Sequence, residues 1–486
     1  MNGRTSGPEL PKVTLGADGW RGRIGWGFSV ASASAVGRAV AETLAAQGAI
    51  AALVSHDARE LSGPAAAAVA KAAAAHMDVT LVAYLPTPVA SGALRAGQFD
   101  AAILVTASHN PADWNGVKVR VAPGVPVDRE IEQAIEQRLA DPACVTDIAF
   151  RVGRRNVRGA DAASFVTAHI DAALDRVGSG TVEPNSAHVV VDGLHGIAGA
   201  AMTRMCRALG WRTHELGTTP HQRFHSIIPD PVRVDSRTRV SSEVRRLEAD
   251  FGIIVDGDGD RIWIIDEWGE AIQPATLFTL LLRDELATTD GTVADEPVND
   301  TRPPVAVTVS CGITVNRFCA EFALPVVERP VGFKHIAPSI ADGEVWAGAG
   351  GVGDLAVAPY CIDRDPMAVL ALFARLLRHE TTIRPGKLAK RLADHYGQTY
   401  REERHIPGDY TNHNLHQTGQ IVLKRLGMSE HLMEVTDIDG AKFRLNDESW
   451  VLLRSASTEG GVRIFTETSD AMLTKTMTDA FESAFS

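Results

Sequence analysis

The sequence predicts an α/β protein of four domains: three similar mixed α/β units with helix-covered sheets, followed by a C-terminal α+β domain. The chain has 486 residues, more than one hydrophobic core usually organises, and 45% of them are hydrophobic. Short apolar runs of strand character alternate with helical segments over most of its length, which is typical of sheets covered by helices. This alternation stops near residue 384, where strand-like runs take over.

The first domain is expected to span residues 1–155. It contains three apolar runs of strand length, at 50–54, 79–85 and 101–105. The Ala-rich segment 64–76 is predicted to be a helix, because alanine has the highest helix propensity and the preceding Ser-Gly-Pro supplies starting signals.

The boundaries of the later domains are predicted in the same way, from the order of strand-like and helical segments. The second domain, 156–270, has predicted helices at 162–176 and 197–209 and strands at 188–191, 251–255 and 262–265. The third, 271–383, has a predicted helix at 274–287 and strands at 305–309 and 325–327. The last, 384–486, begins with a helix at 385–395 and continues with strands at 450–454 and 462–466.

Charge and cysteine content narrow the class of protein. The formal charge of -12 argues against a nucleic-acid partner or an anionic membrane surface, although it leaves room for a local phosphate pocket. The five cysteines are scattered and form no C-x-x-C pair, which disfavours disulfides and zinc sites. Residues 1–12 lack the apolar segment of a signal peptide, so we expect a cytoplasmic protein, either a monomer or a homodimer.

A polar loop, Thr106-Ala107-Ser108-His109-Asn110-Pro111, follows the apolar run 101–105. Open α/β sheets place ligands and chemistry at the carboxyl ends of their strands, so this loop is a candidate site. Ser108 is a candidate nucleophile, with His109 beside it and Lys118 a few residues later. Adjacent serine and histidine residues are common, and the pattern alone is equally compatible with an ordinary polar loop.

A second candidate loop, Asp256-Gly257-Asp258-Gly259-Asp260-Arg261, lies between two apolar runs. Three carboxylates at alternate positions, with glycines between them, can direct oxygens to one point, which suits a hard divalent cation such as Mg²⁺. The alternatives are an acidic surface turn and part of a Ca²⁺ loop. The flanking apolar strands disfavour the first, and the missing glutamate at the end of an EF-hand loop disfavours the second.

Both loops resemble those of the α-D-phosphohexomutases, the phosphoglucomutase and phosphomannomutase family, and the resemblance runs from about residue 15 to about residue 468. Further matches in order are Gly16-Ala17-Asp18-Gly19-Trp20-Arg21-Gly22, Pro86-Thr87-Pro88-Val89, Val191-Asp192-Gly193-Leu194-His195-Gly196, Val331-Gly332-Phe333-Lys334-His335 and Arg454-Ser455-Ala456-Ser457-Thr458-Glu459. The resemblance implies a phosphoryl group on Ser108 and Mg²⁺ held against it by Asp256, Asp258 and Asp260.

The implied activity is that of an intramolecular phosphotransferase. Phosphoserine 108 would pass its phosphoryl group to a sugar monophosphate, and the resulting bisphosphate would turn over and return the other phosphoryl group. By the same resemblance Arg21 contacts ligand phosphate. Arg261, directly after the acidic loop, is a candidate contact for substrate or phosphate. Lys118 and His109 are the candidates for moving the hydroxyl proton, and Lys118 is favoured because a site dense in phosphate needs its charge. Each of the three could instead be purely structural. A sugar bisphosphate is a candidate activator.

The resemblance also implies a distal phosphate-binding region. Its expected members are Lys334, His335, Arg454, Ser455, Ser457, Thr458 and Arg463. The family pattern at the last-domain loop is R-P-S-G-T-E, so Ala456 stands where a serine is expected and Ser457 where a glycine is. We therefore expect the donors of this loop to be rearranged.

The main departure from the family lies in residues 348–354, which we call the recognition loop. The family's usual G-G-E-E-S-G-G is replaced by Gly-Ala-Gly-Gly351-Val352-Gly-Asp354, so the side-chain carboxylate and hydroxyl that read ring hydroxyls are absent. Unpaired substrate hydroxyls weaken binding strongly, so ordinary glucose or mannose phosphates are expected to be poor substrates. A deoxy, modified or carbocyclic sugar phosphate is the expected replacement, with Asp354 a partial substitute for the lost carboxylate.

Two other functions remain open at this stage. A catalytically silent protein that senses a phosphosugar would explain the altered recognition loop, although it would have no need for both Ser108 and the three aspartates. A sugar phosphatase would arise if water intercepted the phosphoserine.

Overall fold

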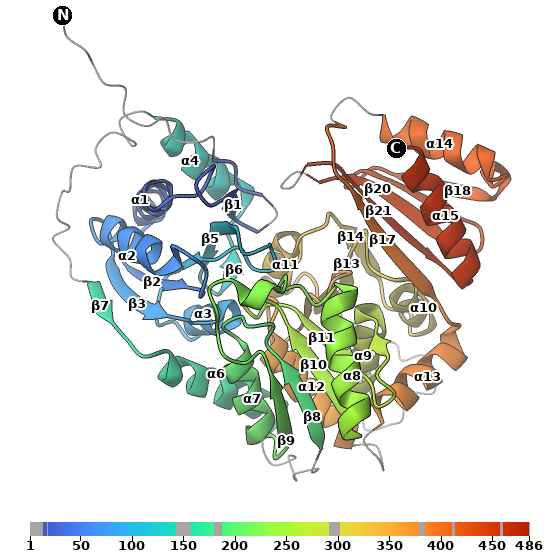
Figure 1. Cartoon of the computed structure of the whole chain (residues 1–486), viewed down its shortest axis with the longest axis horizontal. Coiled ribbons are helices and arrows are strands. Elements are labelled where there is room, and N and C mark those ends of the chain that lie inside the picture. Colours follow the sequence, from blue (N-terminus) through green and yellow to red (C-terminus); the bar gives the residue numbers. More distant parts are fainter. Residues whose placement is uncertain are drawn as a thin grey trace, which may run out of the picture. The chain divides into compact units, whose positions relative to one another are not determined.

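The computed structural model describes residues 13–16, 18–141, 157–178, 187–290, 302–378, 384–410, 414–456 and 460–485. The chain divides into two compact units. Unit 1 comprises Met1–Ala271 and Ala358–Arg384, and unit 2 comprises Ile272–Val357 and Pro385–Ser486. Four sheets with their helices confirm the α/β class that the sequence predicts (Figure 1). The four-domain boundaries stay a prediction.

The first sheet of unit 1 has seven strands in the order β1-β5-β4-β2-β3-β7, with β6 on β5. The strands are β1 Trp20–Arg23, β2 Ala51–His56, β3 Asp78–Ala83, β4 Ala101–Val105, β5 Trp114–Val121, β6 Val125–Pro126 and β7 Val157–Gly159. The helices that follow them in the chain are α1 Val30–Ala46, α2 Ser62–Ala73, α3 Thr87–Arg95 and α4 Arg129–Ala140. Strands β3, β2 and β4 run parallel, whereas β5 is antiparallel to β4 and β1.

Apolar side chains of α1, α2 and α4 cover one face of this sheet. Val36, Val69 and Ile135 pack with Val54 and Ile103 in one core, and all five are completely buried. The run 101–105 is buried at every position, as expected for a strand with both faces covered.

The second sheet of unit 1 has the order β12-β11-β10-β8-β9. Its elements are α6 Ala162–Val177, β8 His188–Asp192, α7 Gly199–Ala208, β9 Arg212–Leu216, α8 Val234–Leu247, β10 Phe251–Val255, β11 Ile262–Ile265 and β12 Ala271–Ile272. Strands β9, β8 and β10 are parallel, and β11 returns antiparallel to β10. Helix α12, Pro366–Arg378, also belongs to unit 1, and its Phe373 meets Phe251 of β10 edge to face.

Unit 2 holds a four-stranded sheet in the order β14-β13-β15-β16. Its elements are α9 Pro274–Asp290, β13 Val305–Thr308, α10 Ile313–Glu321, β14 Val326–Arg329, α11 Ala337–Ala341, β15 Ala347–Ala349 and β16 Leu355–Val357. The two neighbours of β13 run parallel to it, and β16 is antiparallel to β15. The recognition loop therefore forms the turn between β15 and β16.

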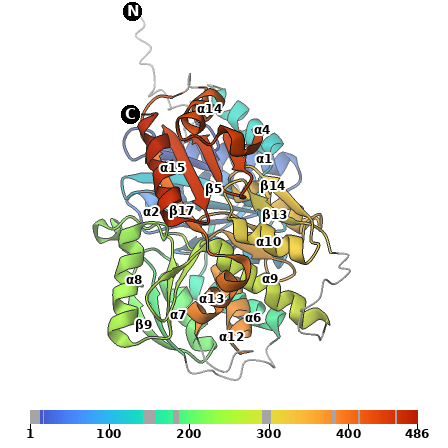
Figure 2. The ribbon, with the colours of Figure 1, turned by 90° about the vertical axis from the view of Figure 1, so that its right-hand side faces the viewer.

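The last sheet of unit 2 is entirely antiparallel, in the order β17-β21-β20-β19-β18. Its elements are α13 Pro385–Tyr396, β17 Tyr400–Ile406, α14 Leu415–Arg425, β18 Leu432–Thr436, β19 Ala441–Leu445, β20 Trp450–Ser455, β21 Val462–Thr468 and α15 Ala471–Ser483. Helices α14 and α15 pack on it through a core that includes Leu423, Phe443 and Phe481 (Figure 2). This antiparallel sheet with helices on one face is the predicted α+β arrangement.

Within the described part of the chain, the structure contains no helix that is both long and apolar enough to cross a membrane.

Gly116 of β5 allows three backbone segments to approach one another. A Cβ atom there would overlap the carbonyl oxygen of Trp20 and lie 2.9 Å from that of Thr106. Gly159 of β7, a glycine in the same sheet, has nothing within 4 Å of its would-be Cβ. The close approach at Gly116 couples strands β1 and β5 to the loop that follows β4.

We expect Gly116→Ala to lower the free energy of unfolding by about 1–3 kcal/mol, because the added methyl group meets backbone that cannot move aside. Thermal unfolding of Gly116→Ala and of the control Gly159→Ala would check this. An alanine at 116 that melts with the wild type, as the control should, would contradict the steric argument.

Candidate functional site

Ser108 lies in the loop that follows β4, with its side chain almost fully buried. Its backbone has φ +52°, a left-handed conformation that non-glycine residues seldom adopt. Its Oγ donates a hydrogen bond to Oδ2 of Asp256 at 2.7 Å. The two loops that the sequence predicts to work together are therefore in contact within unit 1.

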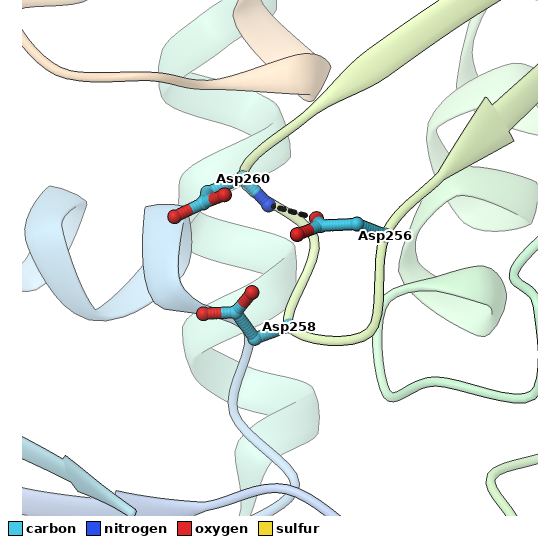
Figure 3. Close-up of side chains that lie close together, drawn as sticks. All are labelled: Asp256, Asp258 and Asp260. Atoms are coloured by element: carbon cyan, nitrogen blue, oxygen red, sulfur yellow. Dashed lines mark hydrogen bonds between the residues drawn. The ribbon is translucent and has the colours of Figure 1, made fainter. Parts of the chain in front are cut away.

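The three aspartates form the tight turn between β10 and β11. One ligand oxygen from each of Asp256, Asp258 and Asp260 lies within 4.8 Å of the others, and all three residues are buried. Figure 3 shows the carboxylates around a shared space, with the backbone nitrogen of Asp260 donating to Asp256 Oδ1 at 2.9 Å. A Cβ at Gly257 would lie 2.5 Å from the Ser108 carbonyl oxygen, so a glycine is required where the loops meet.

Some carboxylate oxygens of the acidic turn accept hydrogen bonds from side chains, and others have no hydrogen-bond partner among the described residues. Oδ2 of Asp258 accepts a hydrogen bond from Thr87 Oγ1 at 2.6 Å, and Oδ2 of Asp260 accepts one from Lys118 Nζ at 2.7 Å. Oδ1 of Asp258 and of Asp260 is buried without a hydrogen-bond partner among the described residues. Buried, unpaired anionic oxygens from neighbouring side chains fit a hard divalent cation, which takes oxygen ligands.

Lys118 of β5 is a cation that the fold itself supplies to this cluster. Its Nζ lies 2.7 Å from both Asp258 Oδ2 and Asp260 Oδ2 and 2.6 Å from Asp18 Oδ2. Burial lowers the pKa of Lys118, but these three carboxylates outweigh burial and hold the pKa above its ordinary value. Lys118 therefore carries a positive charge in this form of the site.

The negative charge of the turn is still incompletely balanced. Burial, with the neighbouring carboxylates of Asp260 and Asp258, raises the pKa of Asp256 well above its ordinary value. Burial also raises the pKa of Asp258, but Lys118 outweighs it and brings that pKa below the ordinary value. One carboxylate of the turn is thus left without an adequate counter-charge, as expected of a site that binds a cation.

The other predicted catalytic residues of unit 1 belong to, or contact, the serine loop and the acidic turn. His109 Nδ1 lies 3.4 Å from Ser108 Oγ. Arg21 Nη1 donates to Asn110 Oδ1 at 2.7 Å, which ties the Arg21 turn to the serine loop. Arg261 Nη1 lies 3.7 Å from Asp230, and its backbone nitrogen donates to Asp256 Oδ1 at 3.1 Å. The structure thus brings the predicted catalytic and metal-binding residues together.

Charged residues for which the sequence patterns predict no role complete this network. Asp18 Oδ1 accepts from Arg120 Nη2 at 3.0 Å, and Asp18 Oδ2 lies 3.0 Å from Arg364 Nη2. The same Arg364 nitrogen is 3.0 Å from Asp260 Oδ2, and Arg120 Nε donates to Asp363 Oδ2 at 2.9 Å. Arg120 could have been predicted from its position in β5, because it is two residues after Lys118 and alternate residues of a strand point to the same face of the sheet.

The predicted residues of unit 2 form a second basic group. Arg454 of β20 and Arg463 of β21 are cross-strand partners, and Ser455 follows Arg454. Arg454 Nε donates to Asp439 Oδ2 at 2.6 Å, and Arg463 Nη1 to Glu403 Oε1 at 2.6 Å. Burial and the nearby Lys334 lower the pKa of His335, which also feels Arg454. Ser457 and Thr458 lie outside the described residues.

The recognition loop packs its glycines against other side chains of unit 2. A Cβ at Gly351 would overlap the guanidinium group of Arg401 and lie 2.6 Å from the Ser310 carbonyl oxygen. Val352 is half-buried, and its backbone nitrogen donates to Asp354 Oδ1 at 3.2 Å. Asp354 is 6% exposed and its carboxylate folds back over Gly350, so it serves the loop's own backbone.

Two family models match the chain. Residues 12–143 match phosphoglucomutase/phosphomannomutase, alpha/beta/alpha domain I, and residues 167–269 match alpha/beta/alpha domain II of the same family. Among curated proteins, the phosphoglucosamine mutase of Bradyrhizobium diazoefficiens is 26% identical over 421 residues, 84% of this chain and 83% of that protein.

Solved structures share the fold along the whole chain. A phosphoglucomutase/phosphomannomutase family protein from Burkholderia thailandensis superposes with a TM-score of 0.77 at 22% identity, covering 98% of this chain and 97% of that one. N-acetylphosphoglucosamine mutase of Aspergillus fumigatus, determined in complex with GlcNAc-6P and magnesium, gives 0.56 at 14% identity, covering 97% and 96%. The serine loop, the acidic turn and these likenesses agree: the chain belongs to the α-D-phosphohexomutase superfamily, a family of intramolecular phosphotransferases.

Proposed function

We propose that this protein is a phosphomutase that moves a phosphoryl group between two hydroxyls of a sugar or sugar-like phosphate. The observation that carries the proposal is the 2.7 Å hydrogen bond between Ser108 Oγ and Asp256, within a cluster of three buried carboxylates. A serine hydroxyl is a weak nucleophile by itself, but phosphoserine is a phosphoryl donor when its surroundings stabilise the transferring charge.

The transfer conserves charge and protons. The bond between phosphorus and Ser108 Oγ breaks as a bond forms to a hydroxyl of the monophosphate, giving a bisphosphate, and the hydroxyl proton ends on Oγ. His109 Nδ1, 3.4 Å from Oγ, is placed to deliver that proton, and the charged Lys118 is its alternative source. The reverse step with the other phosphoryl group regenerates phosphoserine 108.

Mg²⁺ is the cation we assign to Asp256, Asp258 and Asp260, with the phosphoryl group on Ser108 as a further ligand. When bound, it would supply Lewis-acid stabilisation of the transferring phosphoryl oxygens. The unpaired Oδ1 atoms of Asp258 and Asp260 support this assignment. Arg21 and Arg261, which belong to unit 1 like Ser108, are assigned to contacts with the phosphate that reacts there.

The non-reacting phosphate is assigned to the basic group of unit 2. Its members are Lys334, His335, Arg454, Ser455, Ser457, Thr458 and Arg463. The cross-strand pairing of Arg454 with Arg463 supports the assignment, because two guanidinium groups can bind phosphate oxygens bidentately. A sugar bisphosphate activator is part of the same proposal, since it would phosphorylate Ser108 directly.

The substrate is proposed to be a deoxy, modified or cyclitol phosphate. Gly351 and Val352 offer no hydrogen-bonding side chain, and the Asp354 carboxylate already accepts from Val352 N. Ring recognition would then depend on backbone groups and on apolar contact with Val352. We further propose a cytoplasmic monomer or homodimer.

The same recognition loop favours a second candidate, a protein that binds a phosphosugar without converting it. In that case Ser108 would carry no phosphoryl group. A phosphatase would differ from both by releasing inorganic phosphate in step with substrate loss.

Ser108→Ala is expected to abolish turnover of every substrate, because the proposed route passes the phosphoryl group through the Ser108 oxygen. Positional isomers from a panel of hexose, deoxyhexose and cyclitol phosphates would be followed by phosphorus NMR, and intact mass would report the phosphoryl group on wild-type Ser108. Ser91→Ala is the matched control, since the buried Ser91 hydroxyl has no hydrogen-bond partner among the described residues. Substantial turnover by Ser108→Ala would rule out the phosphoserine route.

Asp258→Asn and Asp260→Asn are each expected to weaken Mg²⁺ or Mn²⁺ binding by at least about tenfold, since each replaces a charged ligand with a neutral one. Titration calorimetry on the purified protein measures this without any assay of turnover. Asp266→Asn is the control: Asp266 is also buried, and its Oδ1 accepts backbone hydrogen bonds that asparagine can keep. Equal affinities in all three variants would remove the metal assignment.

Restoring the family's glutamate at position 351 is not expected to restore glucose 1-phosphate turnover. The Gly351→Glu side chain would start inside the space of Ser310 and Arg401, so the loop must distort and the melting temperature should fall. Val352→Ser, at the neighbouring half-buried position, is the control and should melt close to the wild type. A gain in glucose 1-phosphate turnover by Gly351→Glu would show that the loop has room that we do not expect.

A further inference from the structure

Side chains hold both the backbone nitrogen and the backbone carbonyl oxygen of Ser108. Its nitrogen donates to Thr106 Oγ1 at 2.9 Å, and its carbonyl oxygen accepts from Arg59 Nη2 at 2.6 Å. These bonds fix the peptides that flank a residue in the left-handed region, which a serine would leave if unconstrained. The conformation that aims Oγ at Asp256 therefore depends on Thr106 and Arg59.

Arg59, in the loop after β2, directs its guanidinium group at the serine loop. Its side chain is completely buried. All five N–H donors have partners: Asp57 Oδ2 at 2.9 Å and the carbonyl oxygens of Ser108, Asn110, Pro111 and Trp114 at 2.6, 2.8, 2.6 and 3.1 Å. A planar fork with five fixed donors can define the path of a loop in a way that a single ammonium group cannot.

Asp57 connects Arg59 to Thr106. Its Oδ2 accepts from Arg59 Nε and from Thr106 Oγ1 at 2.7 Å, and its Oδ1 accepts from Arg59 N at 2.9 Å and Ser62 Oγ at 2.7 Å. The Thr106 hydroxyl thus donates to Asp57 and accepts from Ser108, which leaves it one orientation. Buried polar networks in which each member is satisfied are rigid.

Phe224, from the predicted second domain, also contacts Arg59. The guanidinium carbon of Arg59 lies 4.7 Å from the ring centroid of Phe224, which is completely buried. The ring closes one face of the guanidinium group and adds a cation–π contact. The guanidinium group of Arg59 is therefore hydrogen-bonded at its edge to Asp57 and packed on one face against the Phe224 ring.

We propose that Asp57, Thr106 and Arg59 are positioning residues for phosphoryl transfer, which hold Ser108 in the left-handed conformation required for attack and release. None of them is assigned a contact with substrate or metal. The inference rests on the proposed function, because it assumes that Ser108 carries the phosphoryl group.

Thr106→Val tests the proposal with a nearly isosteric side chain that can neither accept from Ser108 N nor donate to Asp57. We expect the single-turnover rate of phosphoryl transfer between Ser108 and glucose 1,6-bisphosphate, followed by intact mass, to fall about 10²-fold, since small misplacements of reacting groups cost this much. The bisphosphate concentration for half-maximal rate should stay near that of the wild type. Thr106→Ser, which keeps the hydroxyl, should return the rate to within a few-fold.

A purely structural role would give a different result. It predicts a lowered melting temperature with a transfer rate equal to that of the wild type, or an equal loss in the valine and serine variants, and either outcome overturns the proposal. Mn²⁺ affinity should be unchanged in Thr106→Val, because the three aspartates are intact. A loss of Mn²⁺ binding that matches the loss of rate would also count against positioning.

If Thr106→Val does not fold, Arg59→Lys decides the question in the same assay. It keeps the charge beside Asp57 but cannot reproduce five donors, so the same loss of rate is expected, and a wild-type rate would overturn the proposal. A wild-type protein that carries no phosphoryl group on Ser108 as purified or after incubation with glucose 1,6-bisphosphate, and that converts no member of the phosphate panel, would overturn the proposed function and this inference with it. A phosphorylated wild type and an equally fast Thr106→Val would overturn the inference alone.

Discussion

The contact between the serine loop and the acidic turn places several carboxylates where water cannot reach them. Buried anions are costly unless they are paired, so the rest of the site can be understood as the means of tolerating Asp256, Asp258 and Asp260. Lys118 and Arg364 neutralise part of the charge, and Thr87 satisfies one oxygen. The two oxygens without a hydrogen-bond partner among the described residues, Oδ1 of Asp258 and of Asp260, mark the place where we propose that a divalent cation binds.

Close backbone approach is the second requirement of this arrangement. The serine loop and the turn come from two different sheets of unit 1, and they meet where Gly257 faces the Ser108 carbonyl. The left-handed backbone of Ser108 is stabilised by Arg59, which donates to the same carbonyl oxygen, and by Thr106, which accepts from the Ser108 nitrogen. Ser108 is thus fixed by its main chain, which leaves its Oγ free to change hydrogen-bond partners.

Unit 2 differs from the acidic turn of unit 1 in the groups that it offers to a ligand, which are mainly hydrogen-bond donors and cations. Its phosphate-binding candidates are donors, and the recognition loop between β15 and β16 lacks the acceptors of the usual family pattern. The glycine at 351 is accommodated by tight packing against Ser310 and Arg401. The altered loop is therefore built into the packing of unit 2.

The sequence by itself determined the class of fold and the centre of the site. Apolar patterns are a local property of the sequence, so the strands 101–105 and 251–255 could be predicted. The alternate spacing of aspartates 256, 258 and 260 likewise sufficed to predict that their carboxylates lie close together. The partners of these residues could not be predicted in this way. Asp18, Arg59 and Arg364 are distant in sequence from the groups that they contact, and only the tertiary structure decides which buried charges meet, because ion pairing depends on distance in space and on exclusion of water.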